Sequence, residues 1–267
     1  FIVDLHIHSR YSRACSKSLE LPLIAKACEQ KGISVVTTGD FTHPRWFEHL
    51  ADTLQEDRPG IYRLKNNSSP TRFVIGTEVA CIYKHRDATR RVHLLLFAPT
   101  IEIAGKINQA LSDRGCNLKA DGRPILGVSA KDLLKLMLDI DDRCVMIPAH
   151  AWTPWFAVFG SKSGYNSLEE CFEELTPRIK AIETGLSSDP VMNRRLSMLD
   201  GITLISNSDA HSLDNLAREA NVFTFEKESD LTYDSLFAAI QHGDRKHFAY
   251  TDRKSTRLNS SHANVSR

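Results

Sequence analysis

The opening stretch FIVDLHIH, residues 1–8, decides the predicted fold. A short apolar run that ends in polar residues is typical of a strand buried in a parallel sheet. Alternate side chains of a strand point to the same face, so His6 and His8 are expected to lie together. Two imidazoles in that arrangement can bind one metal ion or two adjacent ones. The stretch therefore predicts a buried strand that presents metal ligands at its end.

Strand-like and helix-like segments alternate along the rest of the chain. Further strands are predicted at residues 33–38, 72–83, 90–98, 144–149, 179–184, 203–206, 222–225 and 246–250. Helices are predicted at residues 19–31, 45–55, 101–114, 130–140, 167–175, 190–199 and 233–242, and loops at 57–71 and 117–127. The alternation indicates an α/β fold with a parallel sheet, and the number of repeats favours a closed or nearly closed barrel. Chemistry in a barrel collects at the C-terminal ends of the strands.

Bulk composition excludes few functions. The 267 residues carry a net charge of +1, so no global basic character points to nucleic acid, although a local basic groove stays open. The six cysteines are widely spread, which favours buried reduced thiols in a cytoplasmic protein. No apolar run is long enough to cross a bilayer, so no membrane partner is expected.

Both ends of the sequence suggest an incomplete chain. It begins at Phe1, without methionine and already inside a strand-like run, so the natural start is expected to be missing. The pattern is globular to Thr251, and we expect one domain over residues 1–251. Residues 252–267, DRKSTRLNSSHANVSR, resemble the translation of a common sequencing adapter and are interpreted as read-through. The alternative is a natural disordered basic tail.

Histidine and acidic residues recur at the predicted strand ends. A lone histidine in an apolar strand is more often a hydrogen-bonded core residue than a metal ligand. The joint pattern is different, because charged groups are rarely buried without a partner and a metal cluster supplies one. Nitrogen and oxygen ligands without thiolate suit zinc, manganese or iron. The predicted metal ligands are His6, His8, Asp40, Glu78, His93, His150, Asp209 and His211.

These motifs resemble those of the polymerase and histidinol phosphatase (PHP) superfamily. The resemblance rests on DLHIHS (4–9), TGD (38–40), GTE (76–78), the isolated His93, PAH (148–150) and NSDAH (207–211). It implies a distorted (βα)7 TIM-like barrel that holds two or three divalent ions, such as zinc, manganese, iron or magnesium, and hydrolyses phosphate esters.

Within that superfamily the chain most resembles the endonuclease Q family. The segments are DLHIHSRYS (4–12), TGDFTHPRWF (38–47), HAWTPWFAVFGSKSG (150–164) and ETGLSSDP (183–190). The resemblance implies a metal-dependent DNA repair endonuclease that nicks 5′ to uracil, hypoxanthine or xanthine, or at abasic sites. The family continues into a zinc-bearing C-terminal region that this chain lacks, and a replication clamp is a further partner that this region would bind.

Two positions depart from the superfamily pattern. Asp40 stands where many members have histidine, and Arg13 stands where many have an acidic residue. One metal site is therefore expected to be weaker, vacant or completed differently.

Asp209 is the predicted catalytic carboxylate of the cluster, and His150, His211 or His43 is expected to protonate the leaving group. The segment after His150 is rich in aromatic residues, as an enzyme that holds a base out of the stack requires. The expected substrate-binding residues are Trp152, Trp155, Phe156, Phe159, Ser161, Lys162 and Tyr165. The alternative is a loop that merely packs on the barrel rim.

Other polar residues are less informative. Glu183 ends a predicted strand and is expected either behind the metal ligands or facing DNA. Arg10, Arg13, Lys17 and Arg45 either line a DNA groove or form a solvated face.

Two other functions remain open. One is a small-molecule phosphatase of the histidinol-phosphate type, against which the tryptophan-rich segment and the lack of a phosphate cradle weigh. The other is a PHP-like DNA-binding module without activity, although the full ligand set argues against decay.

Overall fold

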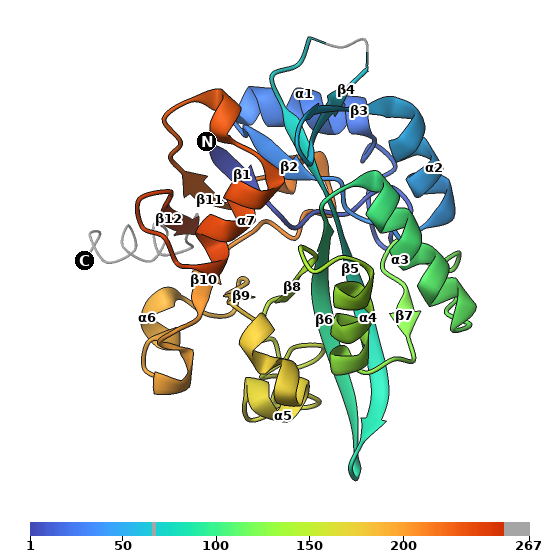
Figure 1. Ribbon diagram of the computed structural model, residues 1–267, viewed down its shortest axis with the longest axis vertical. Coiled ribbons are helices and arrows are strands. Elements are labelled where there is room, and N and C mark those ends of the chain that lie inside the picture. The colour runs from blue at the N-terminus through green and yellow to red at the C-terminus, as the bar shows by residue number, and fades with distance from the viewer. Residues whose placement is uncertain (66–67, 254–267) are drawn as a thin grey trace, which may run out of the picture.

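Twelve strands of mixed direction form the centre of the computed structural model, which describes residues 1–65 and 68–253 (Figure 1). They are β1 (Ile2–Asp4), β2 (Val35–Thr37), β3 (Leu54–Arg58), β4 (Ile61–Leu64), β5 (Arg72–His85), β6 (Ala88–Ala98), β7 (Ile125–Leu126), β8 (Val145–Pro148), β9 (Ala181–Glu183), β10 (Thr203–Ile205), β11 (Glu219–Phe223) and β12 (Phe248–Arg253).

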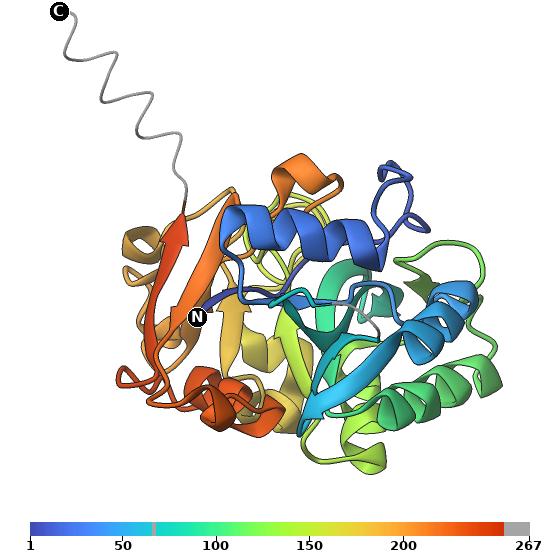
Figure 2. The same cartoon turned by 90° about the horizontal axis from the view of Figure 1, so that it is seen from above.

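Helices surround these strands. They are α1 (Leu21–Lys31), α2 (Pro44–Thr53), α3 (Ile101–Asp113), α4 (Ala130–Ile140), α5 (Leu168–Phe172), α6 (Pro190–Asn193) and α7 (Tyr233–Gln241). Short 3₁₀ segments cover Glu173–Arg178, Ser197–Leu199, Leu213–Asn215 and Glu228–Asp230. Seen from above, α1 and α7 lie on opposite sides of the strands near the N-terminus (Figure 2). Within the described residues no helix is both long enough and apolar enough to cross a membrane.

The predicted α/β class is confirmed, but a closed barrel is not shown. The main sheet runs β12-β11-β1-β2-β5-β4-β3, and β6 joins β5 to β8. Among the described residues, β9 pairs only with β10, in a separate two-stranded sheet. β1, β2 and β5 are parallel, whereas β6 is antiparallel to both β5 and β8. β6 runs antiparallel because only a tight turn connects it to β5. A backbone hydrogen bond from Ala151 to Glu183 spans the gap between β8 and β9 at 2.9 Å.

The strands nevertheless surround a common core. Val3 of β1, Val74 of β5, Ile147 of β8 and Ile205 of β10 belong to one buried cluster, and Phe237 of α7 packs into the same cluster. A second, larger cluster lies under α1, α2, α3 and α4. Burial of apolar surface on both faces explains why the short strands read as continuous hydrophobic runs. It also fixes the strand ends, from which the polar residues project.

Local signals in the sequence predicted several helix boundaries. Gly32 ends α1 with φ of +74°, and the Ser129 side chain caps α4 by accepting the Asp132 N–H at 3.0 Å. The predicted loop 57–71 is wrong in part, because β4 lies within it and pairs with β3. β12 extends to Arg253, two residues beyond the expected domain end, and residues 254–267 lie outside the described part of the chain.

Candidate metal centre

The first and last motifs meet just beyond β1 and β10. Ile7 forms a parallel bridge with Ala210, and the His8 N–H donates to the Ala210 carbonyl at 3.1 Å. The buried carboxylate of Asp4 holds both segments, since it accepts the backbone N–H groups of His6 and Ser208 at 3.3 and 3.1 Å. Residues about 200 positions apart in sequence thereby contribute side chains to one site.

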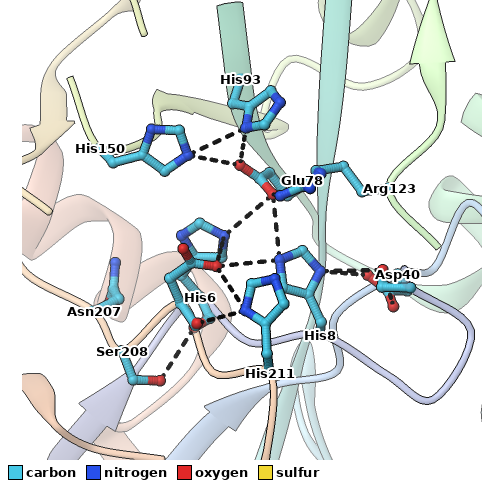
Figure 3. Close-up of polar contacts among 12 residues, drawn as sticks. His6, His8, Asp40, Glu78, His93, Arg123, His150, Asn207, Ser208 and His211 are labelled. Carbon is cyan, nitrogen blue, oxygen red and sulfur yellow. Dashed lines mark hydrogen bonds and ion pairs between the residues drawn. The ribbon is translucent and has the colours of Figure 1, made fainter. Parts of the chain in front are cut away.

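Four side chains converge on one point in this site (Figure 3). His6 Nε2 lies 3.5 Å from Glu78 Oε2 and 3.5 Å from Asp209 Oδ1. His8 Nε2 lies 3.3 Å and 3.2 Å from the same two oxygens. We call His6, His8, Glu78 and Asp209 the first group.

The first group fits a metal ion because its converging atoms lack other partners. Among the described residues, Nε2 of His6, Nε2 of His8 and Oδ1 of Asp209 are buried without a hydrogen bond. Such atoms normally pair, and leaving each unpaired costs about 1–3 kcal/mol. A cation between two imidazoles and two carboxylates would satisfy them together.

Glu78 also belongs to a second group. Its Oε1 lies 2.8 Å from Nδ1 of His93 and 3.0 Å from Nε2 of His150, and those two nitrogens are 3.2 Å apart. The two oxygens of Glu78 therefore face different groups (Figure 3). This arrangement would allow one carboxylate to bridge two adjacent cations.

Two further carboxylates hold the histidines of the first group in orientation. Glu183 contacts Nδ1 of His6 through both oxygens at 3.1 Å, and Asp40 contacts Nδ1 of His8 at 3.1 Å. A carboxylate on Nδ1 favours the tautomer whose Nε2 lone pair is free to bind a metal. These contacts place Asp40 and Glu183 behind the ligand atoms.

The titration behaviour reflects this concentration of acids. Burial lowers the pKa of His6, but Glu183, Asp209 and Glu78 raise it well above its ordinary value. Burial also lowers the pKa of His8, but the neighbouring carboxylate of Asp40 raises it. The net result is a pKa well above the ordinary value. Burial raises the pKa of Glu78, but His93, His6 and Arg123 hold it well below its usual range. The carboxylates around the first group therefore favour positive charge at His6 and His8, and a bound cation would supply such charge.

Three residues of the site have left-handed backbone conformations. Asp40, His150 and Asp209 follow strands with φ of +48°, +28° and +46°. Non-glycine residues seldom adopt such values, and each costs on the order of 1 kcal/mol. The turns direct these side chains into the site instead of along the strand.

The expectation that the ligands recur at strand ends does not hold for two of the residues. Glu78 and His93 lie inside the long strands β5 and β6, because that hairpin continues well past the site. His6, Asp40, His150 and Asp209 do follow the short strands β1, β2, β8 and β10, as expected.

Two other predicted residues, His211 and His43, lie outside the two groups. His211 is about one-third exposed, its ring lies 4.6 Å from that of His8, and its Nδ1 bonds the Asp209 carbonyl at 2.9 Å. His43 instead stacks on Tyr11 at 4.4 Å, and its Nδ1 has no partner among the described residues. His43 and Tyr11 line a pocket of about 460 Å³ together with Pro44, Arg45 and Lys119.

The aromatic segment is joined directly to the second group. The Phe156 ring lies 4.6 Å from that of His93, and the Phe156 carbonyl accepts the His93 N–H at 2.9 Å. Thr153 contacts Nδ1 of His150 at 3.1 Å. Trp155 is 52% exposed, and the Arg91 guanidinium lies 5.7 Å from the centre of its ring.

Other members of the segment differ in accessibility. Phe159 and Tyr165 are buried in the core, and Trp152 donates its indole N–H to Asn193. Ser161 and Lys162 are exposed. Packing on the rim and availability to a ligand therefore coexist in this one segment.

Sequence reasoning missed one residue of the site. Arg123, between α3 and β7, donates from Nη1 to Glu78 Oε2 at 2.9 Å. It lies in a predicted loop and in no recognised motif, so only the fold reveals it. Glu183 could have been identified more firmly from its position at a strand end and from the segment ETGLSSDP (183–190), which it opens.

Two curated proteins are similar to this chain in sequence. No family model matches the chain. The uncharacterized protein YqxK of Bacillus subtilis is 31% identical over 230 residues, which cover 82% of this chain and 57% of that protein. An uncharacterized protein of Methanocaldococcus jannaschii is 28% identical over 152 residues, which cover 57% of this chain and 16% of that protein.

Solved structures give a stronger match. The lesion-specific endonuclease Q of Pyrococcus furiosus superposes with a TM-score of 0.78 at 30% identity, covering 92% of this chain and 57% of that one. A second endonuclease Q structure, in complex with a 27-mer duplex carrying an abasic lesion at the active site, matches equally well. PsfC of Pseudomonas syringae, at 14% identity and a TM-score of 0.56, shares the fold.

The predicted resemblance to endonuclease Q is thus confirmed in sequence and in fold. The chain spans little more than half the length of YqxK and of the endonuclease Q structures.

Proposed function

We propose that this chain is the metal-dependent catalytic part of a DNA endonuclease that cleaves the phosphodiester 5′ to a deaminated base or at an abasic site. The observation that carries the proposal is the convergence of unpartnered Nε2 and carboxylate atoms in the first group, next to a second group that shares Glu78. The likeness to a lesion-specific DNA endonuclease over 92% of the chain supports DNA as the substrate.

Each of the two groups would hold one divalent cation. His6, His8, Glu78 and Asp209 would hold one divalent ion, and Glu78, His93 and His150 a second. Bound there, such ions would supply Lewis-acid activation of water and of the phosphate. Zinc, manganese, iron and magnesium remain candidates, because imidazole and carboxylate ligands suit all of these to different degrees. Asp40 is already engaged by His8, and we propose that it orients that ligand.

Proton transfer falls to the most accessible histidine of the site. Hydrolysis forms a bond from water oxygen to phosphorus and breaks the bond to the leaving oxygen, which must take up a proton. His211 is about one-third exposed, and Nδ1 is tied to a carbonyl, so its Nε2 is left to exchange a proton with substrate. His150 is held by Glu78, and His43 lies against Tyr11, so both suit this role less well.

DNA would contact the site on two sides. The Phe156 ring lies against His93 of the second group, and the preceding residue, Trp155, is exposed, so both could offer aromatic surface to an unstacked base. The pocket beside His43, with Arg45 and Lys119, offers cations to a neighbouring phosphate. A clamp partner and a cytoplasmic location stay predictions from the sequence.

The test uses the 267-residue chain with end-labelled duplexes that contain one uracil, hypoxanthine or abasic site, each with manganese, magnesium or zinc. We expect a single cut on the 5′ side of the lesion and none in the unmodified duplex. Asp209→Asn, which removes one anionic ligand, is the matched control. Hydrolysis of histidinol phosphate without any cut in DNA would replace this proposal with the phosphatase, and DNA binding without hydrolysis would indicate an inactive module.

A further inference from the structure

Arg123 is the basic side chain that reaches the centre of the site. Its Nη1 donates to Glu78 Oε2 at 2.9 Å, the oxygen that also faces His6 and His8. This is the one hydrogen bond that its guanidinium makes within the described residues, and the side chain is 27% exposed. A guanidinium carries five N–H donors, so several remain for a bound molecule.

The backbone around Arg123 is fixed by the first motif. The Gly122 N–H donates to the Tyr11 carbonyl at 3.0 Å, and the Ala80 N–H of β5 donates to the Pro124 carbonyl at 3.0 Å. A Cβ at Gly122 would lie 2.3 Å from Asp40 Oδ2. Only glycine lets the backbone at residue 122 lie this close to Asp40. The position of the loop in turn places Arg123 next to Glu78.

The neighbouring carboxylate is already engaged on both of its oxygens. Asp40 accepts the Ser9 N–H and hydroxyl at 2.7 Å each and the Ser12 hydroxyl at 2.8 Å, besides its contact with His8. It belongs to neither metal group among the described residues. Arg123 supplies a positive charge in direct contact with Glu78, the residue that the two groups share.

Resting on the proposed function, we propose that Arg123 is a catalytic residue that binds a non-bridging oxygen of the scissile phosphate. The positive charge of the Arg123 guanidinium takes the place of a further metal ion beside the two ligand groups. Guanidinium matches phosphate geometry with two parallel N–H donors, and its charge stabilises the extra negative charge of the transition state. The hydrogen bond to Glu78 orients the guanidinium of Arg123, and the exposed edge of the guanidinium faces the substrate.

The experiment compares Arg123→Met, Arg123→Lys and a control, Arg114→Met. Arg114 is exposed at the end of α3, and its side chain contacts only the Ala110 carbonyl among the described residues. Each protein is loaded with the metal that supports most activity. Metal content, melting temperature, binding of inorganic phosphate by calorimetry, and hydrolysis of bis(p-nitrophenyl) phosphate are then measured.

We expect Arg123→Met to keep its metal content and fold but to weaken phosphate binding about 10- to 100-fold. Its kcat on the diester should fall about 100- to 1,000-fold, as for other lost transition-state donors. Arg123→Lys should recover part of the phosphate affinity, because the charge remains without the paired donors. The control should match the parent protein.

Two results would overturn the role of Arg123. One is phosphate affinity in Arg123→Met equal to that of the control, and the other is metal loss in step with activity, which would make Arg123 a support for Glu78. Failure of the parent protein to cut lesion DNA or the diester would instead refute the proposed function. The phosphate titration would still decide whether Arg123 binds the anion.

Discussion

Replacing Glu183 with glutamine should weaken metal binding although Glu183 is not itself placed as a ligand. The side chain is 1% exposed, and its two oxygens accept the backbone N–H of His150 and the amide of Asn207, both at 2.8 Å. Both oxygens also face Nδ1 of His6 at 3.1 Å. The substitution preserves shape and removes one acceptor and the negative charge.

The magnitude follows from the count of donors. A glutamine offers one oxygen and one NH₂ group, so at least one of the three donors loses its acceptor, whichever way the amide turns. One unpartnered buried donor costs about 1–3 kcal/mol. Loss of the carboxylate behind a histidine ligand lowers metal affinity about 10- to 100-fold. We therefore expect the zinc Kd to rise by that factor.

The assay is competition for zinc against a chromophoric chelator, with far-ultraviolet circular dichroism as the check on folding. Glu102→Gln is the matched control, because Glu102 lies on the exposed first turn of α3 and pairs only with Lys106 among the described residues. If folded Glu183→Gln bound zinc as tightly as the control, the carboxylate would not orient His6 and the reasoning would be refuted.

Three further substitutions test other parts of the structure. Asp209→Asn should leave the melting curve nearly unchanged while diester hydrolysis falls more than about 100-fold; turnover at the parent rate would contradict the cluster. Gly122→Ala places a Cβ 2.3 and 2.4 Å from two polar side-chain atoms and should lower the free energy of unfolding by about 1–3 kcal/mol in urea titrations, whereas Gly127→Ala, with open space around it, should not. Partial burial raises the pKa of Asp57, but hydrogen bonds from Arg72 and a neighbouring arginine hold it below normal. Its stabilisation is therefore present above the unfolded pKa of about 3.9 and lost as pH falls through the folded value. The difference in urea midpoint between the parent and Asp57→Asn should shrink at acid pH; a constant difference would exclude an ionic cause.

Much of the site could be predicted because each motif contains its own chemistry. His6 and His8 are two residues apart at the end of an apolar strand, so their side chains are expected on the same face. Asp209 and His211 have the same spacing. Six of the eight predicted ligands fall into the two groups that the structure brings together. Local caps such as Ser129 are equally readable, because they depend on neighbours three residues apart.

The rest depends on contacts between segments far apart in sequence. The contacts of Asp40 with the hydroxyls of Ser9 and Ser12 could not be predicted, because they join separate segments; its role as a metal ligand stays a prediction. Arg123 has no signal of its own, since a basic residue in a polar loop is most often solvated. The open sheet was equally hidden, because periodicity distinguishes strands from helices and cannot determine whether β8 pairs with β9.

The left-handed turns at Asp40, His150 and Asp209 have a consequence for the substitutions that these positions can accept. Glycine would occupy each of these backbone positions without steric cost, so a change to glycine would relieve local backbone strain. The same change would remove a side chain that belongs to one of the two groups or that contacts His8. At these three positions, relief of backbone strain and loss of a polar group of the site are therefore the same substitution.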